Sequence, residues 1–174
     1  VPDELEVLEA GARFVAPVRH GQKTGWFYDQ AWNRPLLDPW ARGARVLDVF
    51  CYAGAWGVQA ARGGASEVVC VDSSAAALTV VQRNAALNGV EVTTRQGDAF
   101  EVLEAMAAAK ERFDVVVVDP PAFAKRRKDV PKAQAAYKRI NQLAMQLLPR
   151  DGLLVSCSKR KVCSVWVMSR MISG

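Results

Sequence analysis

The stretch RVLDVFCYAGAWG, residues 45–57, is the part of the sequence that most clearly indicates a fold. It begins as an apolar strand that carries Asp48 near its end, and it continues into a turn of small residues. A helix is predicted to begin near Gly54. Such a turn brings a ligand to the N-terminus of a helix, where backbone N–H groups point outward and the helix dipole is positive.

The glycines of this turn indicate the class of ligand. A dinucleotide fingerprint needs the pattern G-x-G-x-x-G, so that the backbone can approach a pyrophosphate. Gly54 and Gly57 are present, but Cys51 and Tyr52 stand where such a fingerprint would have glycine. The turn therefore favours a nucleoside without a pyrophosphate, and S-adenosylmethionine is the candidate. A strand–turn–helix connection that binds no ligand is the alternative.

Length, composition and charge exclude several classes of protein. The chain has 174 residues, of which 51% are apolar, which is enough for one domain with a buried core. It has no apolar run of about 18 residues and no signal-peptide pattern, so we expect no membrane contact. The four cysteines lack metal-ligand spacing and there is one histidine, so we expect no metal site and a cytoplasmic protein with reduced thiols. The net charge of +5 is compatible with a polyanionic partner.

Residues 1–35 are predicted to form a small N-terminal unit, and residues 36–174 the main domain. Apolar and polar residues alternate on both sides of Ala10-Gly11, which indicates a β-hairpin over residues 1–18. The next segment, HGQKTGWFYDQAWNR (20–34), has no clear periodicity. It is either a surface loop with some buried aromatic residues or a segment that faces a ligand.

From Arg45 onward, short apolar strands alternate with amphipathic helical patterns. Strands of nearly continuous Val and Leu, separated by helices, are typical of a parallel sheet covered on both faces. The sequence therefore predicts an α/β fold with a doubly wound, mostly parallel, Rossmann-like sheet, in which ligands bind beyond the carboxyl ends of the strands. The predicted strands are 46–50, 67–71, 90–95, 113–118 and 152–156, and the predicted helices are 55–62, 75–88, 100–110 and 132–148.

Acidic residues follow the second and third of these strands. A carboxylate at Asp72, next to Ser73, can accept hydrogen bonds from both ribose hydroxyls of a nucleoside. Its alternative role is to cap the following helix, although Ser74 can cap that helix by itself. Asp98, followed by Ala99, can accept from an adenine amino group or cap the next helix, and these two roles are compatible.

The fourth strand, FDVVVVDPP (113–121), ends at Asp119 and two prolines. Prolines lack the N–H donor that would continue a sheet, so they stiffen the exit and hold Asp119 at the mouth of the sheet. The order acid–Pro–Pro–aromatic, completed by Phe123, favours a functional site over a simple strand terminator. The cations that follow are either a solvated surface loop or phosphate contacts. They are Lys125, Arg126, Arg127 and Lys128.

Cys157 follows the fifth strand, in the segment SCSKRK (156–161). A cysteine within a strand is normally a small hydrophobic residue, which is how we interpret Cys70. Cys157 instead stands at the carboxyl end of its strand and next to three cations, which favour the nucleophilic thiolate. The local sequence leaves open both a nucleophile and a structural thiol.

Together these motifs resemble one known family, the S-adenosylmethionine-dependent 23S ribosomal RNA cytosine-C5 methyltransferases of the RlmI-like group. The matching motifs, in order, are HGQKTGWFYDQAWNR, VLDVFCYAGAWG, VVCVDSSAAAL, GDAFEVL, FDVVVVDPPAFAKRRKDV, YKRINQLAMQLL and LLVSCS. The resemblance implies S-adenosylmethionine as cofactor, ribosomal RNA as substrate and Cys157 as nucleophile. The cofactor-binding residues that it implies are Gln30, Arg34, Asp48, Phe50, Tyr52, Ala53, Gly54, Asp72, Ser73, Asp98, Ala99 and Asp119.

The implied reaction gives roles to Cys157 and Asp119 as catalytic residues. Carbon 5 of cytosine is too electron-poor to attack a sulfonium methyl group unaided. Addition of a thiolate at carbon 6 produces an enamine whose carbon 5 is nucleophilic, and Asp119 would stabilise the protonated ring. β-Elimination after methyl transfer then releases Cys157. The target nucleotide must be unpaired or flipped out, and Trp26 or Phe123 would stack on it.

The chain departs from the family at both ends. Family members carry an RNA-binding PUA domain upstream, which we expect to be absent here, and they continue after the SCS motif with a helix and a final antiparallel strand pair. The tail KRKVCSVWVMSRMISG is different, so we expect an incomplete sheet with an apolar edge. The tail is a truncated or altered end, or it pairs with another chain, for example in a homodimer. The alternatives to cytosine-C5 methylation are methylation of an exocyclic base amine and an inactive fragment that binds the cofactor or RNA.

Overall fold

The computed structural model describes residues 3–18, 25–123, 129–158 and 162–167, with the side chains of residues 158 and 162–167 left out. The described chain contains a two-stranded sheet and a six-stranded sheet, whose strand order is β5-β4-β3-β6-β7-β8. The strands are β1 (Glu4–Glu9), β2 (Ala12–Pro17), β3 (Arg45–Val49), β4 (Glu67–Asp72), β5 (Thr93–Gln96), β6 (Val115–Val118), β7 (Leu153–Ser158) and β8 (Val162–Val167). The helices are η1 (Tyr28–Gln30), η2 (Arg34–Leu37), α1 (Asp38–Ala41), α2 (Ala55–Arg62), α3 (Ala75–Leu87), α4 (Ala99–Ala108) and α5 (Val130–Gln146).

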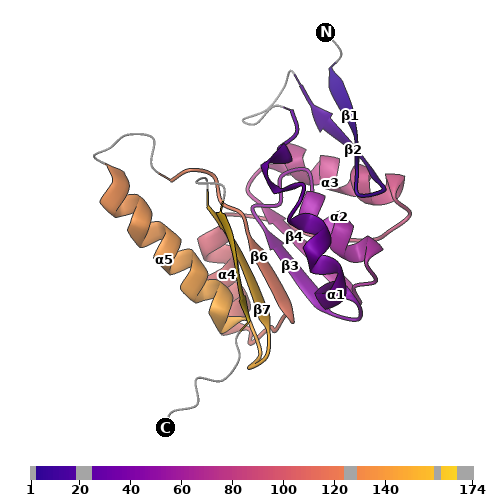
Figure 1. The fold of residues 1–174 in the computed structure, drawn as a ribbon. Helices are drawn as coiled ribbons and strands as arrows, with labels where there is room; N and C mark the ends of the chain where they lie inside the picture. The colour runs from indigo at the N-terminus through magenta and orange to yellow at the C-terminus, as the bar shows by residue number, and fades with distance from the viewer. Residues whose placement is uncertain (1–2, 19–24, 124–128, 159–161, 168–174) are drawn as a thin grey trace.

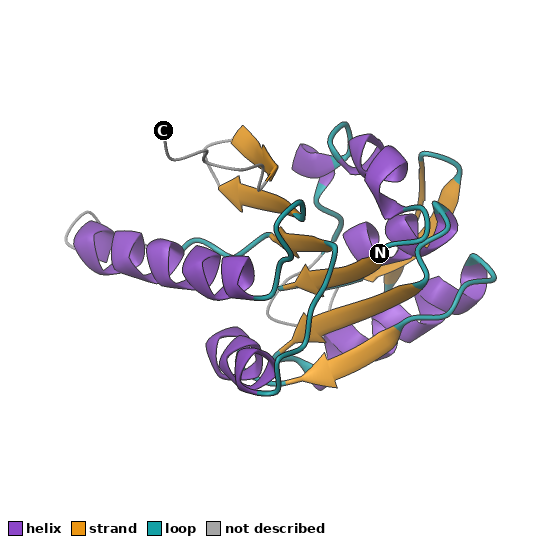
Figure 2. Cartoon of the chain, turned by 90° about the horizontal axis from the view of Figure 1, so that it is seen from below, coloured by secondary structure: helices purple, strands orange, loops and turns teal. Residues whose placement is uncertain are grey.

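The large sheet is the doubly wound sheet that the sequence predicts. Strands β3 to β7 pair in parallel, and the strand order reverses between the adjacent strands β3 and β6. Helices α1, α2 and α3 cover one face, and α4 and α5 cover the other (Figures 1 and 2). Because neighbouring side chains of a strand point to opposite faces, Val46 packs against the first layer and Leu47 against the second. Both faces of the central strands are therefore buried.

The tail beyond β7 contains a strand that we did not predict. Residues Val162–Val167 form β8, which pairs antiparallel with β7, so β7 does not form the apolar edge that we expected. In this register Cys157 is directly opposite Cys163. Residues 159–161 and 168–174 lie outside the described residues.

The hairpin β1–β2 is attached to α3 by two asparagines one helical turn apart. Asn84 accepts the N–H of Val15 (2.8 Å) and donates to its carbonyl (3.1 Å), and Asn88 makes the same pair of contacts with Arg13 (3.0 and 2.7 Å). The two side chains therefore pair with β2 as a neighbouring strand would. Asn84 is fully buried and also donates to the carbonyl of Ala53 in the turn after β3 (2.9 Å).

The structure also differs from the prediction in the bounds of several elements. Strand β7 continues to Ser158 and so includes Cys157, which we placed after the strand. Strand β6 begins at Val115 and not at residue 113. The strand predicted at residues 90–95 begins only at Thr93, because Val90 donates its N–H to Ala85 and so completes the end of α3. The stretch 28–41, which we did not divide into elements, folds into η1, η2 and α1. No helix within the described ranges is long and apolar enough to cross a membrane.

Candidate active site

A cavity of about 300 Å³ opens at the carboxyl ends of β3 and β6, where the strand order reverses. This is the place at which a doubly wound sheet binds its ligands. Three segments line the cavity: residues 26–34, the turn between β3 and α2, and the exit of β6. The lining residues are Trp26, Phe27, Asp29, Arg34, Phe50, Cys51, Tyr52, Ala53, Ala55, Trp56, Asp119, Pro120 and Pro121.

The turn after β3 has a constrained backbone. Phe50 and Tyr52 have φ of 63° and 49°, a left-handed conformation that is uncommon for non-glycine residues. Strain of this kind persists only where surrounding contacts hold it. Cys51 donates its N–H to the carbonyl of Val71 (3.0 Å), and Tyr52 donates its N–H to the carboxylate of Asp72 (3.0 Å). The turn is therefore tied to β4 at two consecutive residues.

The two glycines of the turn serve packing. Gly54 is the N-cap of α2 with φ of 78°, and a Cβ there would lie 3.0 Å from Val81 of α3. A Cβ at Gly57 would lie 2.5 Å from Sγ of Cys70, which real structures do not tolerate. Both glycines thus let α2 approach β4 and α3 closely. This physical reason differs from the close approach of a pyrophosphate in a dinucleotide fingerprint.

Asp48 stabilises the turn from its buried side. Its side chain is fully buried and outside the cavity lining, and Oδ2 accepts the N–H of Gly57 (2.9 Å). Its Oδ1 has no hydrogen-bond partner among the described residues. Burial, with a further contribution from Asp119, raises the pKa of Asp48 to about 7. The residue therefore fixes the start of α2, and its contact with a cofactor stays a prediction.

The acids after β4 and β5 are engaged with backbone N–H groups. Asp72 accepts from Tyr52 and from Ser74 (2.9 Å), while the hydroxyl of Ser74 caps α3. Asp98 caps α4 by accepting from the N–H groups of the helix's first turn. The capping role predicted for Asp98 is confirmed. The predicted contacts of Asp72, Ser73, Asp98 and Ala99 with a nucleoside are untested, and none of these residues lines the cavity.

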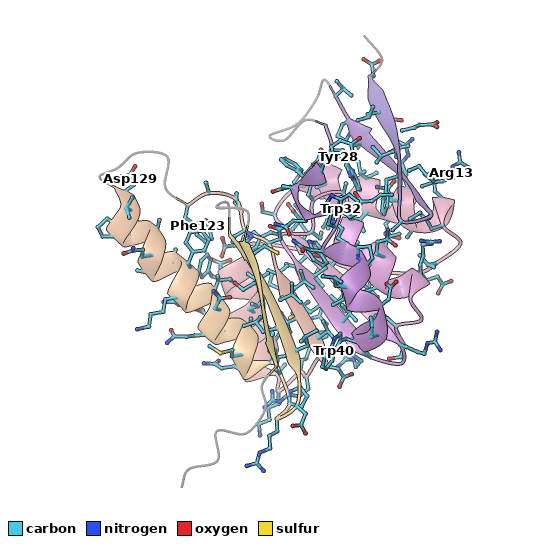
Figure 3. The ribbon with its side chains drawn as sticks, viewed as in Figure 1. Arg13, Tyr28, Trp32, Trp40, Phe123 and Asp129 are labelled. Atoms are coloured by element: carbon cyan, nitrogen blue, oxygen red, sulfur yellow. The ribbon has the colours of Figure 1, made fainter. Side chains whose placement is uncertain are left out.

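Four residues of the segment 20–34 line the cavity, and whether the segment faces a ligand stays a prediction. The hydroxyl of Tyr52 donates to the carbonyl of Gly25 (3.0 Å), and the ring of Phe27 meets that of Tyr52 edge to face. Arg34, which is 3% exposed, donates to the carbonyl of Phe27 (2.8 Å). Gln30 is equally buried but lies outside the cavity lining and accepts from Asn33. Tyr28 and Trp32 of the same segment are exposed (Figure 3).

Asp119 and Cys157 stand at the ends of neighbouring strands. Val118 of β6 is in register with Ser156 of β7, so Asp119 and Cys157 are the next positions of the two strands. The carboxylate of Asp119 accepts the indole N–H of Trp56 (3.3 Å). Cys157 is 1% exposed and belongs to the same apolar cluster as Trp56. Cys157 is outside the cavity lining, so the structure places the two catalytic candidates side by side but only Asp119 in the cavity.

Phe123 packs into an aromatic cluster beside α5 (Figure 3). Its ring centroid lies 4.6 Å from that of Tyr137 and 6.1 Å from those of Phe50 and Phe100. The ring thus connects the turn after β3 with α4 and α5. Its predicted stacking on a nucleobase stays a prediction, as does that of Trp26. The cations of residues 125–128 lie outside the described residues.

Three residues that line or support the cavity were missed in the sequence. Trp56 follows the turn and contacts Asp119, but a tryptophan at a helix start is most simply a core residue. Asn84 and Glu9 hold the hairpin and the cavity wall, and each acts at a distance in sequence that no local pattern reveals. No group of three or more potential metal ligands occurs within the described ranges.

Comparison with known proteins identifies the family. The model of the S-adenosylmethionine-dependent methyltransferase family matches residues 2–168. The chain belongs to this family. The charges of the cavity lining suit the cofactor of the family. The lining includes two acids, which match the sulfonium and ammonium groups of the cofactor, and one cation, which matches its carboxylate. The aromatic rings of the lining suit its adenine base.

Curated relatives of the chain are ribosomal RNA methyltransferases by name. The chain is 42% identical to Ribosomal RNA large subunit methyltransferase I of Aeromonas hydrophila over 164 residues, which covers 90% of this chain and 41% of the relative. It is also 42% identical to a Ribosomal RNA large subunit methyltransferase of Deinococcus radiodurans, covering 90% and 39%. The chain therefore spans about two fifths of the length of the curated relatives it matches.

Solved structures show the same fold around the bound cofactor or its demethylated product. The crystal structure of SMU.776 complexed with SAH (S-adenosylhomocysteine) has a TM-score of 0.77 and 27% identity, covering 90% of this chain and 42% of that chain. The 16S rRNA N2 G1207 methyltransferase of T. thermophilus, in complex with AdoMet and guanosine, has a TM-score of 0.65 and 25% identity, covering 89% and 41%.

Proposed function

We propose that the chain transfers a methyl group from S-adenosylmethionine to carbon 5 of a cytosine in RNA, in particular large-subunit ribosomal RNA. One observation carries the proposal: Asp119, which lines the cavity, and Cys157 directly follow residues that are in register on the neighbouring strands β6 and β7. The names of the curated relatives support the RNA substrate.

The two residues have complementary roles in this chemistry. The Cys157 thiolate adds to carbon 6 of the cytosine ring, which makes carbon 5 nucleophilic toward the methyl group. Asp119 binds the ring edge and stabilises the protonated pyrimidine during that addition. Loss of the carbon-5 proton and elimination of the thiolate then restore both the aromatic ring and Cys157. The cofactor, when bound, supplies the electrophilic methyl group.

The burial of Cys157 adds a requirement. A thiol that is 1% exposed cannot reach a ring atom of a nucleotide, so the packing around it must open when the target base enters. Trp56 belongs to the same apolar cluster and contacts Asp119. Movement of this indole would expose the strand ends together. An enzyme that acts on a base inside RNA also has to take that base out of its stack.

The decisive experiment compares two buried cysteines. Cys157→Ala should lower the transfer of labelled methyl groups to ribosomal RNA by at least about 1,000-fold, since a covalent step cannot proceed without its nucleophile. Cys70→Ala on β4 is the matched control and should retain transfer. An unchanged rate in Cys157→Ala would rule out the covalent mechanism.

The alternative is methylation of an exocyclic base amine, in which Asp119 and the two prolines hold the amine and no cysteine is needed. The structural similarity to an enzyme named for guanosine N2 methylation favours it. Digestion of the methylated RNA separates the two proposals, because the methyl group is then found on carbon or on nitrogen. Methyl-cytosine at carbon 5 supports the first proposal and a methylated amine the second.

A further inference from the structure

Glu9, at the end of β1, is a buried carboxylate that holds two side chains of the cavity wall. It is 8% exposed. Its Oε1 accepts from Nη1 of Arg34 (2.5 Å) and its Oε2 from the indole N–H of Trp26 (2.8 Å). Its backbone carbonyl also accepts from the side chain of Gln59 on α2 (2.9 Å). The hairpin therefore holds two residues of the cavity lining through the carboxylate of Glu9, which does not line the cavity itself.

Arg34 is the one cation among the described residues that line the cavity, and its donors are only partly used. The guanidinium carbon lies 5.3 Å from the ring centre of Trp26 and 5.9 Å from that of Trp56. Glu9 and the carbonyl of Phe27 accept from its two terminal nitrogens. Its buried Nε has no partner among the described residues. A buried donor without a partner is costly, so a site that keeps one points to an acceptor that arrives with a ligand.

Two acids line the cavity together with this guanidinium. Asp29 and Asp119 line the same cavity as Arg34. An arginine without its own buried partner would be drawn toward them, and pairing with Asp119 would occupy the carboxylate that the reaction needs. The ion pair with Glu9 has both side chains less than a tenth exposed, where screening by water is weak. It therefore fixes the guanidinium on the side of the hairpin.

We propose that Glu9 is a positioning residue that holds Arg34 as the anion site for the methionine carboxylate of the cofactor. Arginine suits this role because its planar group can donate two parallel hydrogen bonds to a carboxylate. The inference deepens the cofactor site of the proposed function and rests on it for the identity of the ligand. It does not depend on the cytosine chemistry.

Two ligands distinguish the contribution of the anion site to binding from that of the rest of the pocket. S-adenosylhomocysteine carries the methionine-type carboxylate, whereas 5′-methylthioadenosine has the same adenosine and thioether without it. Calorimetry should show that Arg34→Met weakens S-adenosylhomocysteine by at least about tenfold, the loss of a charge-assisted hydrogen bond, and changes methylthioadenosine by less than about twofold. Glu9→Gln should weaken S-adenosylhomocysteine by about three- to tenfold with the same selectivity.

The controls make each outcome decisive. Glu6→Gln, on the exposed face of the same strand, should leave both affinities unchanged. In the Arg34→Met background, Glu9→Gln should have no further effect on S-adenosylhomocysteine. If Glu9→Gln weakens both ligands equally, the residue is only structural and the proposal fails; it also fails if Arg34→Met leaves S-adenosylhomocysteine unchanged. Should Glu9→Gln not fold, Glu9→Asp, which keeps the charge but shortens its reach, gives the same comparison. RNA is absent throughout, so failure here leaves the cytosine proposal standing.

Discussion

The cavity has two walls that are held in different ways. The early wall is formed by residues 26–34, before β3, and the late wall by residues 119–121, after β6. The early wall is held by polar contacts between segments far apart in sequence: Glu9 accepts from Arg34, and the hydroxyl of Tyr52 donates to the carbonyl of Gly25. The late wall is a strand exit stiffened by two prolines, next to Cys157, which is packed in the apolar core. Under the proposed function, the side that binds the cofactor is preformed and the side that binds the target base must open.

The largest expected effect concerns the attachment of the early wall. Asn84→Ala removes three buried hydrogen bonds to Val15 and Ala53 and leaves their backbone groups unsatisfied. We expect the free energy of unfolding to fall by about 3–5 kcal/mol. Urea denaturation measures it, and Asn88→Ala, whose contacts with Arg13 are exposed, should cost about 1 kcal/mol or less. Equal losses in both variants would mean that the hairpin is not held through the buried residue.

The next effect concerns pH and the support beneath the turn. The pKa of Asp48 is raised from 3.8 to about 7, chiefly by burial. Between these values the folded chain keeps a proton that the unfolded chain has lost, so the free energy of unfolding falls as pH rises. From about pH 5 to about pH 8 the contribution of Asp48 is a loss of about 2–3 kcal/mol. Urea denaturation of the wild type and of Asp48→Asn across this range should show the slope in the wild type alone. The same slope in both would assign it to another group.

The smallest effect concerns Trp56, which contacts both walls. Trp56→Phe keeps an aromatic ring beside Arg34 but removes the N–H that donates to Asp119 at 3.3 Å. A neutral donor of this kind contributes about 0.5–1.5 kcal/mol, so methyl transfer should slow by about two- to tenfold. Affinity for S-adenosylhomocysteine should change less. Steady-state kinetics checks this, and a loss comparable to that of Cys157→Ala would show that the indole is part of the reaction.

The sheet could be predicted because its signals are local. Runs of Val and Leu with period-3.6 stretches between them place each strand and helix to within a few residues, and parallel strands then fix where their ends meet. The cavity at the ends of β3 and β6 follows from the same topology. The resemblance of the motifs added the cofactor, which the family match confirms.

The early wall could not be predicted because its contacts are not local. Glu9 and Arg34 are 25 positions apart, and Asn84 and Val15 are 69 positions apart. Neither pair stands in a periodic pattern, and an asparagine on a helix reads as a surface residue until the strand beside it is known. β8 was missed for another reason: its residues follow a cationic stretch in a tail that we expected to depart from the family, whereas the family model matches through residue 168.

Because Glu9 binds Arg34, the unit that forms the cavity begins earlier in the chain than the parallel sheet does. The parallel sheet begins at Arg45, and a protein cut just before that residue would still contain every strand from β3 to β7. It would lack Trp26, Phe27 and Arg34 from the cavity and Glu9 behind them. In any exchange of domains between relatives, the cavity therefore has to be moved together with the hairpin, as a unit that begins earlier in the chain than the parallel sheet.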